Sequence, residues 1–571
     1  MSNAIELKST NENYRNEPVI GVFSPGDPRI DMESRARCQN IVKMAADIIS
    51  EKVKLPNGMP CKVVYSRTLI DGEIQADQVA SQFKEAGVNI LVGVPDSWSF
   101  PQLTTISLLQ QFPKDTPINL TCGNSGPKPG VVYAHATCGA MAQYGKLCHL
   151  NVGSWPDTGN NPIMSEATSK VLVDWCFAAI TTQYLKGKRV ALIGHDSMGM
   201  ETALAHIIPT RNQFGIEIAR VDMKIIADLL KKEAYDKKEL LELRNFVDTH
   251  CKRIEIYNEE QSKKFNQSLA LYLIVRDFLE NINAIGGGFM SQLEWGSDRR
   301  GICLPTADIM ECFFNSTFDH RGKKAPIPFA TEADMQALLT MLIFSCLTAG
   351  NPPLFMDFRK VWEPWEIKEF AKEKNLLIDE SSEWAVKGFV DGNNSGSAAL
   401  DWAGMREEST ETLLKKVSLP LADEGYFPGG GNSVTFISPG GIKGIAGRLM
   451  YSSLSDMFSL SWDEAITADI PIEIAEAFCS LTDKNWPHTF VIPKYATMSE
   501  YKHLPPANHL HMIEGLSVSR LEYWMDLNLV LSHNSWANRP KYIEGLDRPL
   551  PLIYTANGGE DMAKILLKGK R

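Results

Sequence analysis

The chain lacks long apolar runs, and its N-terminus lacks the pattern of an export signal. The first residues, MSNAIELKSTNENYRNEPV, are polar and contain no apolar core of the kind that a signal peptide needs. The richest apolar stretch, residues 337–347, is much shorter than the roughly 18 apolar residues of a membrane span. We therefore expect a cytoplasmic protein that does not cross a membrane.

A basic excess and paired cysteines are missing as well. The chain has 58 Lys and Arg against 69 Asp and Glu, a net charge of −11, which argues against nucleic acid or an anionic membrane as a partner. Its eleven cysteines are scattered without a CxxC pair. An odd number of cysteines without that motif is typical of free thiols in a reducing compartment.

Several common catalytic motifs are also absent. The sequence has no GxSxG elbow, no HExxH helix and no EF-hand loop, so serine hydrolases, zinc proteases and calcium sensors have no support. The glycine turn at residues 194–199 follows a predicted strand, but it lacks GxGxxG and a Walker Lys-Ser/Thr. An ordinary strand-to-helix turn is therefore favoured over a phosphate cradle.

The length and the apolar pattern together predict the domain organisation. A chain of 571 residues with 44% hydrophobic and 22% charged residues suits several globular domains. Apolar strands alternate with amphipathic helices in two successive units, which predicts parallel sheets covered by helices. Later strands are separated by Gly, Asn and Pro clusters, as in β-rich domains. We predict an α/β protein with doubly wound domains at 1–182 and 183–347 and a β-rich domain at 348–571.

Two carboxylates and a histidine stand in unusual settings. Glu332 follows Thr331, the predicted N-cap of a helix over residues 332–348, where an acid ordinarily favours the helix dipole. Asp357 lies in an apolar strand, where an unpaired carboxylate is costly, and Arg359 is its nearest candidate partner. His509 lies in a polar segment before a further apolar run. Such a set suits an oxygen-rich Mn²⁺ or Mg²⁺ site, but spacing alone does not show that the residues meet.

Four blocks of sequence are similar to the L-fucose isomerase family, whose members often also act on D-arabinose. Weaker matches at 197–199, 221–223 and 235–236 precede them, and the common order extends over nearly the whole chain. The blocks are Phe329-Ala-Thr-Glu332 with Asp357-Phe-Arg-Lys-Val-Trp362, Asn394-Ser-Gly-Ser-Ala-Ala-Leu-Asp401, Tyr426-Phe-Pro-Gly-Gly-Gly431, and Asn485-Trp-Pro487 with Ala507-Asn-His509.

This resemblance implies an aldose–ketose isomerase that works through an ene-diol. It implies a divalent metal, usually manganese with Mg²⁺ or Co²⁺ as alternatives, held by Glu332, Asp357 and His509. Glu332 would be the base and Asp357 the acid. The resemblance also implies a homohexamer in which the first domain completes a neighbour's site. The sugar contacts that it implies are Trp98, Gln292, Tyr426, Trp486 and Asn508.

Two departures from the family pattern leave the substrate open. Phe23 stands where the family has a sugar-binding Arg, and Leu510 stands where it has Gly; Arg29 is a candidate to supply the missing guanidinium. We expect a small-molecule sugar: L-fucose, D-arabinose or a relative. The alternatives are an isomerase for a different or modified sugar and a non-catalytic cytoplasmic sugar-binding protein.

Overall fold

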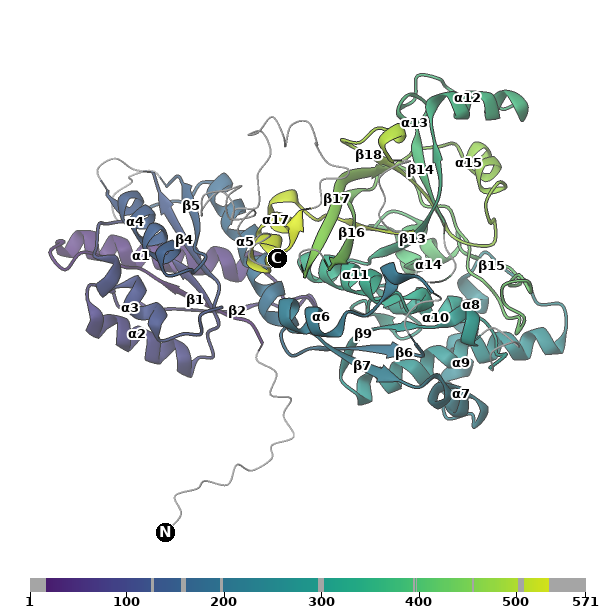
Figure 1. Cartoon of the computed structure of the whole chain (residues 1–571), viewed down its shortest axis with the longest axis horizontal. Helices are drawn as coiled ribbons and strands as arrows, with labels where there is room; N and C mark the ends of the chain where they lie inside the picture. The colour runs from purple at the N-terminus through teal and green to yellow at the C-terminus, as the bar shows by residue number, and fades with distance from the viewer. Residues whose placement is uncertain are drawn as a thin grey trace, which may run out of the picture.

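The computed structural model contains three main sheets and the helices that cover them (Figure 1). No helix among the residues it describes is both long and apolar enough to span a bilayer. The described residues are 17–124, 128–155, 161–195, 199–295, 302–393, 396, 398–453, 456–501 and 508–532.

The N-terminal sheet is fully parallel, with strand order β2-β1-β3-β4-β5. The paired strands β1 and β3 are apolar runs, as expected for strands with helices on both faces of the sheet. The strands are β1 (Val19–Phe23), β2 (Lys62–Tyr65), β3 (Ile90–Gly93), β4 (Ile118–Gly123) and β5 (His149–Gly153). The helices are α1 (Met32–Lys52), α2 (Glu73–Glu85), α3 (Thr105–Gln110), α4 (Gly130–Gln143) and α5 (Glu166–Leu185), with a 3₁₀ turn at Pro101–Leu103.

The second sheet is also parallel, with strand order β12-β9-β6-β7. The strands are β6 (Arg189–Ile193), β7 (Glu217–Val221), β9 (Ala284–Phe289) and β12 (Phe329–Ala330). The associated helices are α6 (Ile207–Phe214), α7 (Met223–Lys231), α8 (Lys237–His250), α9 (Glu259–Asn281), α10 (Asp308–Asn315) and α11 (Met335–Leu347), with a 3₁₀ turn at Glu201–Ala203.

The C-terminal sheet closes on itself. Its order is β16-β19-β13-β14-β18-β17-β20, and β16 also pairs with β17, so six strands form an antiparallel ring. Closure leaves no free edge along the ring. The strands are β13 (Leu354–Trp362), β14 (Phe389–Asn393), β16 (Lys443–Ser452), β17 (Met457–Thr467), β18 (His488–Pro493), β19 (His509–Glu514) and β20 (Leu531–Ser532).

Shorter elements complete the C-terminal half. Two small ribbons join β8 (Arg253–Ile254) to β15 (Ser418–Leu419) and β10 (Phe318–Asp319) to β11 (Gly322–Lys323). The helices are α12 (Pro364–Glu373), α13 (Glu383–Lys387), α14 (Thr410–Leu414), α15 (Ile472–Cys479), α16 (Met498–Tyr501) and α17 (Val518–Leu527). The predicted fold class, parallel α/β units followed by a β-rich region, is confirmed.

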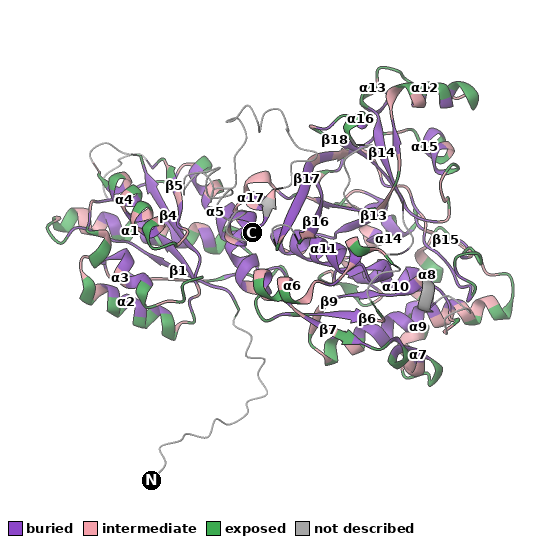
Figure 2. Cartoon of the chain, in the orientation of Figure 1, coloured by how far each residue is buried: buried purple, intermediate pink, exposed green. Residues whose placement is uncertain are grey.

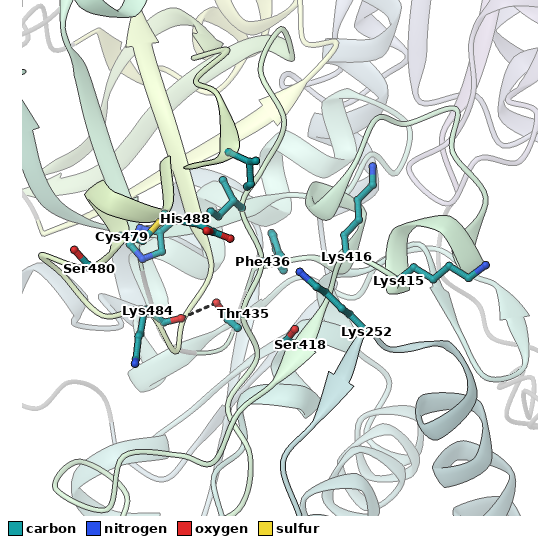
Figure 3. Close-up of a pocket in the computed structure, with 13 residues that line it drawn as sticks. Lys252, Lys415, Lys416, Ser418, Thr435, Phe436, Cys479, Ser480, Lys484 and His488 are labelled. Atoms are coloured by element: carbon teal, nitrogen blue, oxygen red, sulfur yellow. Dashed lines mark hydrogen bonds between the residues drawn. The ribbon is translucent and has the colours of Figure 1, made fainter. Parts of the chain in front are cut away.

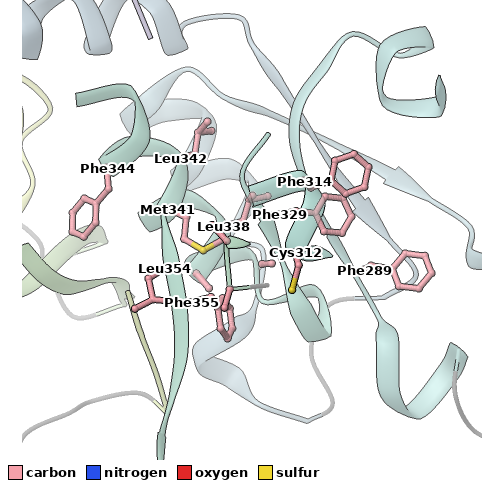
Figure 4. Close-up of a cluster of buried hydrophobic side chains, with 14 of the residues drawn as sticks. Phe289, Cys312, Phe314, Phe329, Leu338, Met341, Leu342, Phe344, Leu354 and Phe355 are labelled. Atoms are coloured by element: carbon pink, nitrogen blue, oxygen red, sulfur yellow. The ribbon is translucent and has the colours of Figure 1, made fainter. Parts of the chain in front are cut away.

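One apolar core joins the second sheet to the C-terminal ring, whereas the N-terminal sheet has its own core. Helix α11 is buried along its whole length between the two layers, and its side chains meet those of β9, β12 and β13 (Figures 2 and 4). The predicted domain boundaries fall near the ends of α5 and α11.

A buried ionic cluster fastens the N-terminal helix α5 to the C-terminal helix α17. Asp174 is 3% exposed and accepts hydrogen bonds from Ser519 Oγ at 2.5 Å and from Arg520 Nη2 at 3.1 Å. The Arg520 guanidinium also lies 3.9 Å over the ring of Phe177. Because Asp174 is buried, removing its charge would leave Arg520 without a counter-charge away from water. Its contribution to stability should therefore exceed that of a surface ion pair.

Asp174→Asn keeps the shape of the side chain and removes the charge that compensates Arg520. We expect it to lower the free energy of unfolding by about 2 kcal/mol. The matched control is Asp47→Asn, which breaks an exposed ion pair with Lys43 on α1 and should change stability by less than about 0.5 kcal/mol. Urea unfolding followed by circular dichroism measures both; equal effects would contradict the assignment.

Candidate active site

Strand pairing brings Asp357 and His509 together. The strands β13 and β19 are antiparallel neighbours, and their register sets Asp357 directly opposite His509. Residues opposite each other on adjacent strands point to the same face of a sheet. Asp357 Oδ1 accordingly lies 3.0 Å from His509 Nε2. The pairing register of β13 and β19 therefore shows that Asp357 and His509 meet, which the sequence spacing alone did not show.

Glu332 reaches the same point from a strained turn. It lies in the 3₁₀ turn Thr331–Ala333, where Glu332 and Ala333 have φ angles of +58° and +53°. Residues with a side chain rarely adopt this left-handed conformation, which is concentrated at functional sites. The turn aims the carboxylate of Glu332 at the ring, so that its Oε2 lies 3.6 Å from His509 Nε2.

The same turn corrects the predicted start of the following helix. Thr331 is not the N-cap, and Glu332 is not in the first turn, because α11 begins only at Met335. Asp334 is the cap instead, and its Oδ1 accepts a hydrogen bond from the Ala337 backbone N–H at 2.8 Å. The positive φ angles are incompatible with a right-handed helix, so the helix cannot extend back to Glu332.

Gln292 holds Glu332 from the other side. Its Nε2 donates a hydrogen bond of 2.6 Å to Glu332 Oε1, and the Glu332 backbone N–H donates to Ser291 Oγ at 3.3 Å. Both residues belong to the segment Ser291–Trp295 that follows β9. The predicted sugar contact Gln292 therefore lies beside the cluster of Glu332, Asp357 and His509.

A second, fully buried carboxylate orients the imidazole of His509. Asp334 Oδ2 lies 2.6 Å from His509 Nδ1 and 2.8 Å from Arg448 Nη1. Arg448 Nη2 donates to the Thr202 carbonyl at 2.7 Å, and Nη1 lies 3.1 Å from His511 Nε2. The ring of His509 is thus fixed with Nδ1 toward Asp334 and Nε2 toward Glu332 and Asp357.

The proton affinities of this network follow from burial and charge. Burial raises the pKa of Glu332, although the nearby imidazole of His509 opposes the rise. Burial disfavours a charged imidazole, yet the hydrogen bonds to Asp334 and Asp357 prevail and raise the pKa of His509 to about 10. Burial acts against the charge of Asp334 too, but Arg448 and His509 hold its pKa well below the usual range.

The donor chemistry of the cluster suits a divalent cation. Two carboxylates and an imidazole nitrogen are ligands that manganese accepts, and a carboxylate on the second nitrogen is the usual partner of a metal-binding histidine. Among the described residues, no three acidic, histidine or cysteine side chains surround a common point as a preformed metal site. Glu332 and Asp357 instead each approach Nε2 of His509.

An arginine connects Asp357 to an aromatic wall. Arg359 Nη2 lies 3.0 Å from Asp357 Oδ2, and the guanidinium lies 5.3 Å from the ring centre of Trp486. Tyr426, which is 55% exposed, has its ring centre 5.6 Å from that of Trp486. The structure therefore brings Trp486 and Tyr426 next to the acidic cluster. Trp486 is itself buried and packs with Phe427.

Asn508, the last of the predicted sugar contacts beside His509, also lies at the cluster. Its Nδ2 is 2.8 Å from His509 Nε2 and 3.3 Å from the sulfur of Met200. The residues 394–395, 397, 507 and 197–198, which contribute to the family blocks, lie outside the described residues.

Trp98 is not brought to this cluster. It follows β3 in the N-terminal sheet, which lies on the opposite side of the molecule from β13 (Figure 1). Its ring packs edge-on against Phe100 and Tyr133. It lines a separate cavity of about 300 Å³ with Asp27, Arg29 and Lys128.

Phe23, which replaces the family's arginine, and Arg29, the candidate substitute, have different surroundings. Phe23 has no exposed surface, and a Cβ added at Gly93 would lie 2.9 Å from its ring, so it packs inside the N-terminal core rather than facing a sugar. Arg29 is 73% exposed at the cavity with Trp98, where its Nη2 lies 2.6 Å from Asp27 Oδ2. A guanidinium is therefore present at this cavity without an arginine at position 23.

A larger cavity is lined by Lys484 and His488, which flank the loop that carries Trp486. It has a volume of about 520 Å³ and is lined by His488, Thr435 and several lysines (Figure 3). Thr435 Oγ1 donates 3.0 Å hydrogen bonds to the carbonyls of Lys484 and Trp486, which fixes this loop. Glu332, Asp357 and His509 do not line it. This cavity is therefore separate from the acidic cluster.

Sequence reasoning missed Asp334, Arg448 and His511. Two signals point to them: Arg448 is a single charge within the apolar run 445–450, and His511 lies two residues after His509, on the same face of β19. Neither signal identifies the partner, because Asp334 is far away in the sequence.

Asp334→Asn removes the charge between Arg448 and His509. Arg448 is 1% exposed, so losing its counter-charge should lower the free energy of unfolding by about 3 kcal/mol. Asp222→Asn is the matched control, because Asp222 is the exposed N-cap of α7 and Asn caps a helix almost as well. Thermal and urea unfolding compare the two; a stability loss as small as the control's would contradict a structural role for this charge.

Comparison with known proteins identifies the family to which the chain belongs. The family model for the first N-terminal domain of L-fucose isomerase matches residues 17–187, and the model for its second N-terminal domain matches residues 188–349. The L-fucose isomerase of Vibrio vulnificus (strain YJ016) is 26% identical over 502 residues, covering 81% of this chain and 82% of that protein.

A second relative extends the match. The L-fucose isomerase of Streptococcus pneumoniae (strain 70585) is 25% identical over 527 residues, 85% of this chain and 86% of the relative. The two family models are adjacent and together span more than half of the sequence. The chain belongs to the L-fucose isomerase family, whose members are aldose–ketose isomerases and hence intramolecular oxidoreductases.

Proposed function

We propose that the chain is a manganese-dependent aldose–ketose isomerase whose substrate is L-fucose, D-arabinose or a related sugar. The observation that carries the proposal is the meeting of Glu332, Asp357 and His509, which come from three separate segments, around one imidazole nitrogen. The similarity to the L-fucose isomerases of Vibrio vulnificus and Streptococcus pneumoniae supports L-fucose among these sugars. Membership of an isomerase family favours catalysis over sugar binding alone.

The proposed cation would be held by Glu332, Asp357 and His509. The imidazole would offer Nε2, because Nδ1 is engaged by Asp334. When bound, a divalent cation polarises a sugar carbonyl and the adjacent hydroxyl and makes the C–H bond between them more acidic. Magnesium or cobalt remains an alternative, because oxygen-rich sites with one imidazole accept several of these ions.

Glu332 is the proposed base. Its Oε1 is occupied by Gln292, so Oε2 is the oxygen that faces the cluster and is placed to take the proton from carbon. Burial raises its pKa, which makes the carboxylate a better proton acceptor than an exposed one. The same carboxyl would return the proton to the neighbouring carbon, as an ene-diol route requires.

Asp357 is the proposed acid at the sugar oxygens. One of its oxygens contacts His509, and the other is held by Arg359. This ion pair keeps the carboxyl oriented while a proton moves between the two sugar oxygens. Arg359 also lies over Trp486, so the proton-transfer group and the aromatic wall are positioned by one side chain.

Removal of metal tests this proposal. Chelation should abolish isomerisation and Mn²⁺ should restore it, and Asp357→Asn should lower kcat at least about 100-fold, since it removes a proton-transfer group while keeping its shape. Aldose panels assayed with added Mn²⁺, Mg²⁺ or Co²⁺ measure the activity, the metal preference and the sugar. Circular dichroism checks that the variant folds. Full activity of the chelated protein would overturn metal dependence.

We also propose that the enzyme works as a homo-oligomer, a hexamer by family resemblance, in which Trp98 and Arg29 complete a neighbour's site. Two observations support this: both residues line a cavity at the carboxyl end of the N-terminal strands, where α/β sheets bind ligands, and that cavity is remote from Glu332 in the same chain. Arg29 would donate hydrogen bonds to sugar hydroxyls in place of the missing arginine.

Mixed oligomers test the shared site. Trp98→Ala and Glu332→Gln subunits should each be impaired alone, because each lacks one half of the site. Refolded or co-expressed as an equal mixture, they should regain about one quarter of the wild-type activity, since random association gives that share of sites with both halves intact. Sedimentation at the assay concentration confirms the assembly. No recovery in a mixture that does assemble would contradict the shared site.

A further inference from the structure

Two thiols in the N-terminal unit, remote from the acidic cluster, lie in direct contact. The Sγ atom of Cys138 is 3.2 Å from the Sγ atom of Cys148, although both cysteines are free. Cys138 is on α4, and Cys148 comes immediately before β5. Neither residue takes part in the proposed isomerisation, so their contact needs a separate explanation.

A tight helix end brings the two thiols together. Helix α4 ends at Gln143, and Gly145 follows with a φ angle of +68°. The Lys146 backbone N–H donates to the Met141 carbonyl at 3.0 Å, which closes the helix in a left-handed turn. The chain therefore reverses within a few residues and returns Cys148 to the side of α4 that carries Cys138.

We propose that Cys138 and Cys148 form an oxidation site that peroxides convert into an intrachain disulfide. The sulfur atoms need only move from 3.2 Å to about 2.05 Å apart. Three facts support the proposal: the contact itself, the short connection that holds it, and the different exposure of the two thiols, since Cys148 is buried and Cys138 is half-buried.

The exposure of the two thiols assigns their roles. Cys138 is partly exposed on α4, whereas Cys148 is buried. Burial raises the pKa of the Cys148 thiol, and the ammonium of Lys146 partly opposes the rise. Cys138 is therefore the thiol that meets the oxidant, and Cys148 is the thiol that resolves the product.

The reaction balances with hydrogen peroxide as the oxidant. The Cys138 thiolate attacks one peroxide oxygen, an S–O bond forms, the O–O bond breaks and hydroxide leaves. The Cys148 sulfur then attacks the sulfenic acid, so that an S–S bond forms, the S–O bond breaks and a second hydroxide leaves. The two thiol protons convert both hydroxides into water, and two electrons pass from sulfur to the peroxide.

The disulfide would clamp the helix that supports Trp98 without entering the sugar cavity. Cys148 precedes β5 and so lies at the amino end of the sheet, whereas the cavity lies at the carboxyl ends of the strands. Tyr133, also on α4, packs edge-on against Trp98 with ring centres 6.4 Å apart. Oxidation should therefore stabilise this unit and leave the cavity intact.

Limited oxidation of the full chain tests the proposal. The background is Cys303→Ser, because Cys303 is exposed and would form links between molecules. Under stoichiometric hydrogen peroxide, we expect the loss of two thiols per chain, reversed by dithiothreitol. Trypsin cuts after Lys146, so the non-reduced digest should contain peptides 115–146 and 147–170 joined together. The linked protein should unfold at a midpoint a few degrees higher than the reduced protein.

Three variants identify the sulfur atoms. Cys138→Ala and Cys148→Ala should each abolish the linked peptide pair. Cys122→Ser is the matched control, because Cys122 shares the peptide 115–146 and should leave the link unchanged. A link that persists without Cys138, or oxidation that stops at a sulfenic or sulfinic acid on Cys138, would overturn the disulfide. An unchanged unfolding midpoint in the linked protein would overturn the clamp.

Discussion

The candidate site depends on the buried charge of Asp334. Its carboxylate faces Arg448 on β16 and His509 on β19, and it also caps α11. Taking two charges out of water costs several kcal/mol unless they are paired and hydrogen-bonded. The Asp334–Arg448 pair is therefore stable only when the ring of strands, α11 and the Thr202 carbonyl are all in place. The second sheet and the C-terminal ring are coupled through this pair as well as through their shared apolar core.

This constraint explains why a strained turn can persist beside it. Glu332 and Ala333 adopt left-handed φ angles that cost on the order of 1–3 kcal/mol each. The cap at Asp334 fixes the residue after the turn, and Ser291 and Gln292 hold Glu332 itself. A relaxed helical conformation at Glu332 would direct its carboxylate along α11 rather than toward His509. The strain therefore places the proposed base, and the surrounding contacts offset it.

The sequence predicted those features that depend on local pattern. Alternating apolar strands and helices gave the parallel units, and short motifs gave the residues that meet at His509. Local pattern does not contain the pairing register between β13 and β19, which alone sets Asp357 opposite His509. The closure of β16 onto β17 depends likewise on distant segments. Motif position showed that Phe23 replaces the family's arginine, but it did not show that the side chain is fully buried in the N-terminal core.

The groups proposed for proton transfer and the guanidinium proposed to bind sugar hydroxyls lie in different parts of the chain. The proton affinity of the proposed base Glu332 is tuned by burial, and its neighbours Asp334 and His509 are buried too, whereas the proposed acid Asp357 is 17% exposed. Recognition of sugar hydroxyls needs donors that solvent and ligand can reach, and Arg29 at the cavity with Trp98 is largely exposed. The Arg359 guanidinium beside the cluster is bound to Asp357 and is only 34% exposed, so it is less free than Arg29 to donate to a sugar. Two half-sites on separate sheets, joined only when subunits meet, would satisfy both requirements.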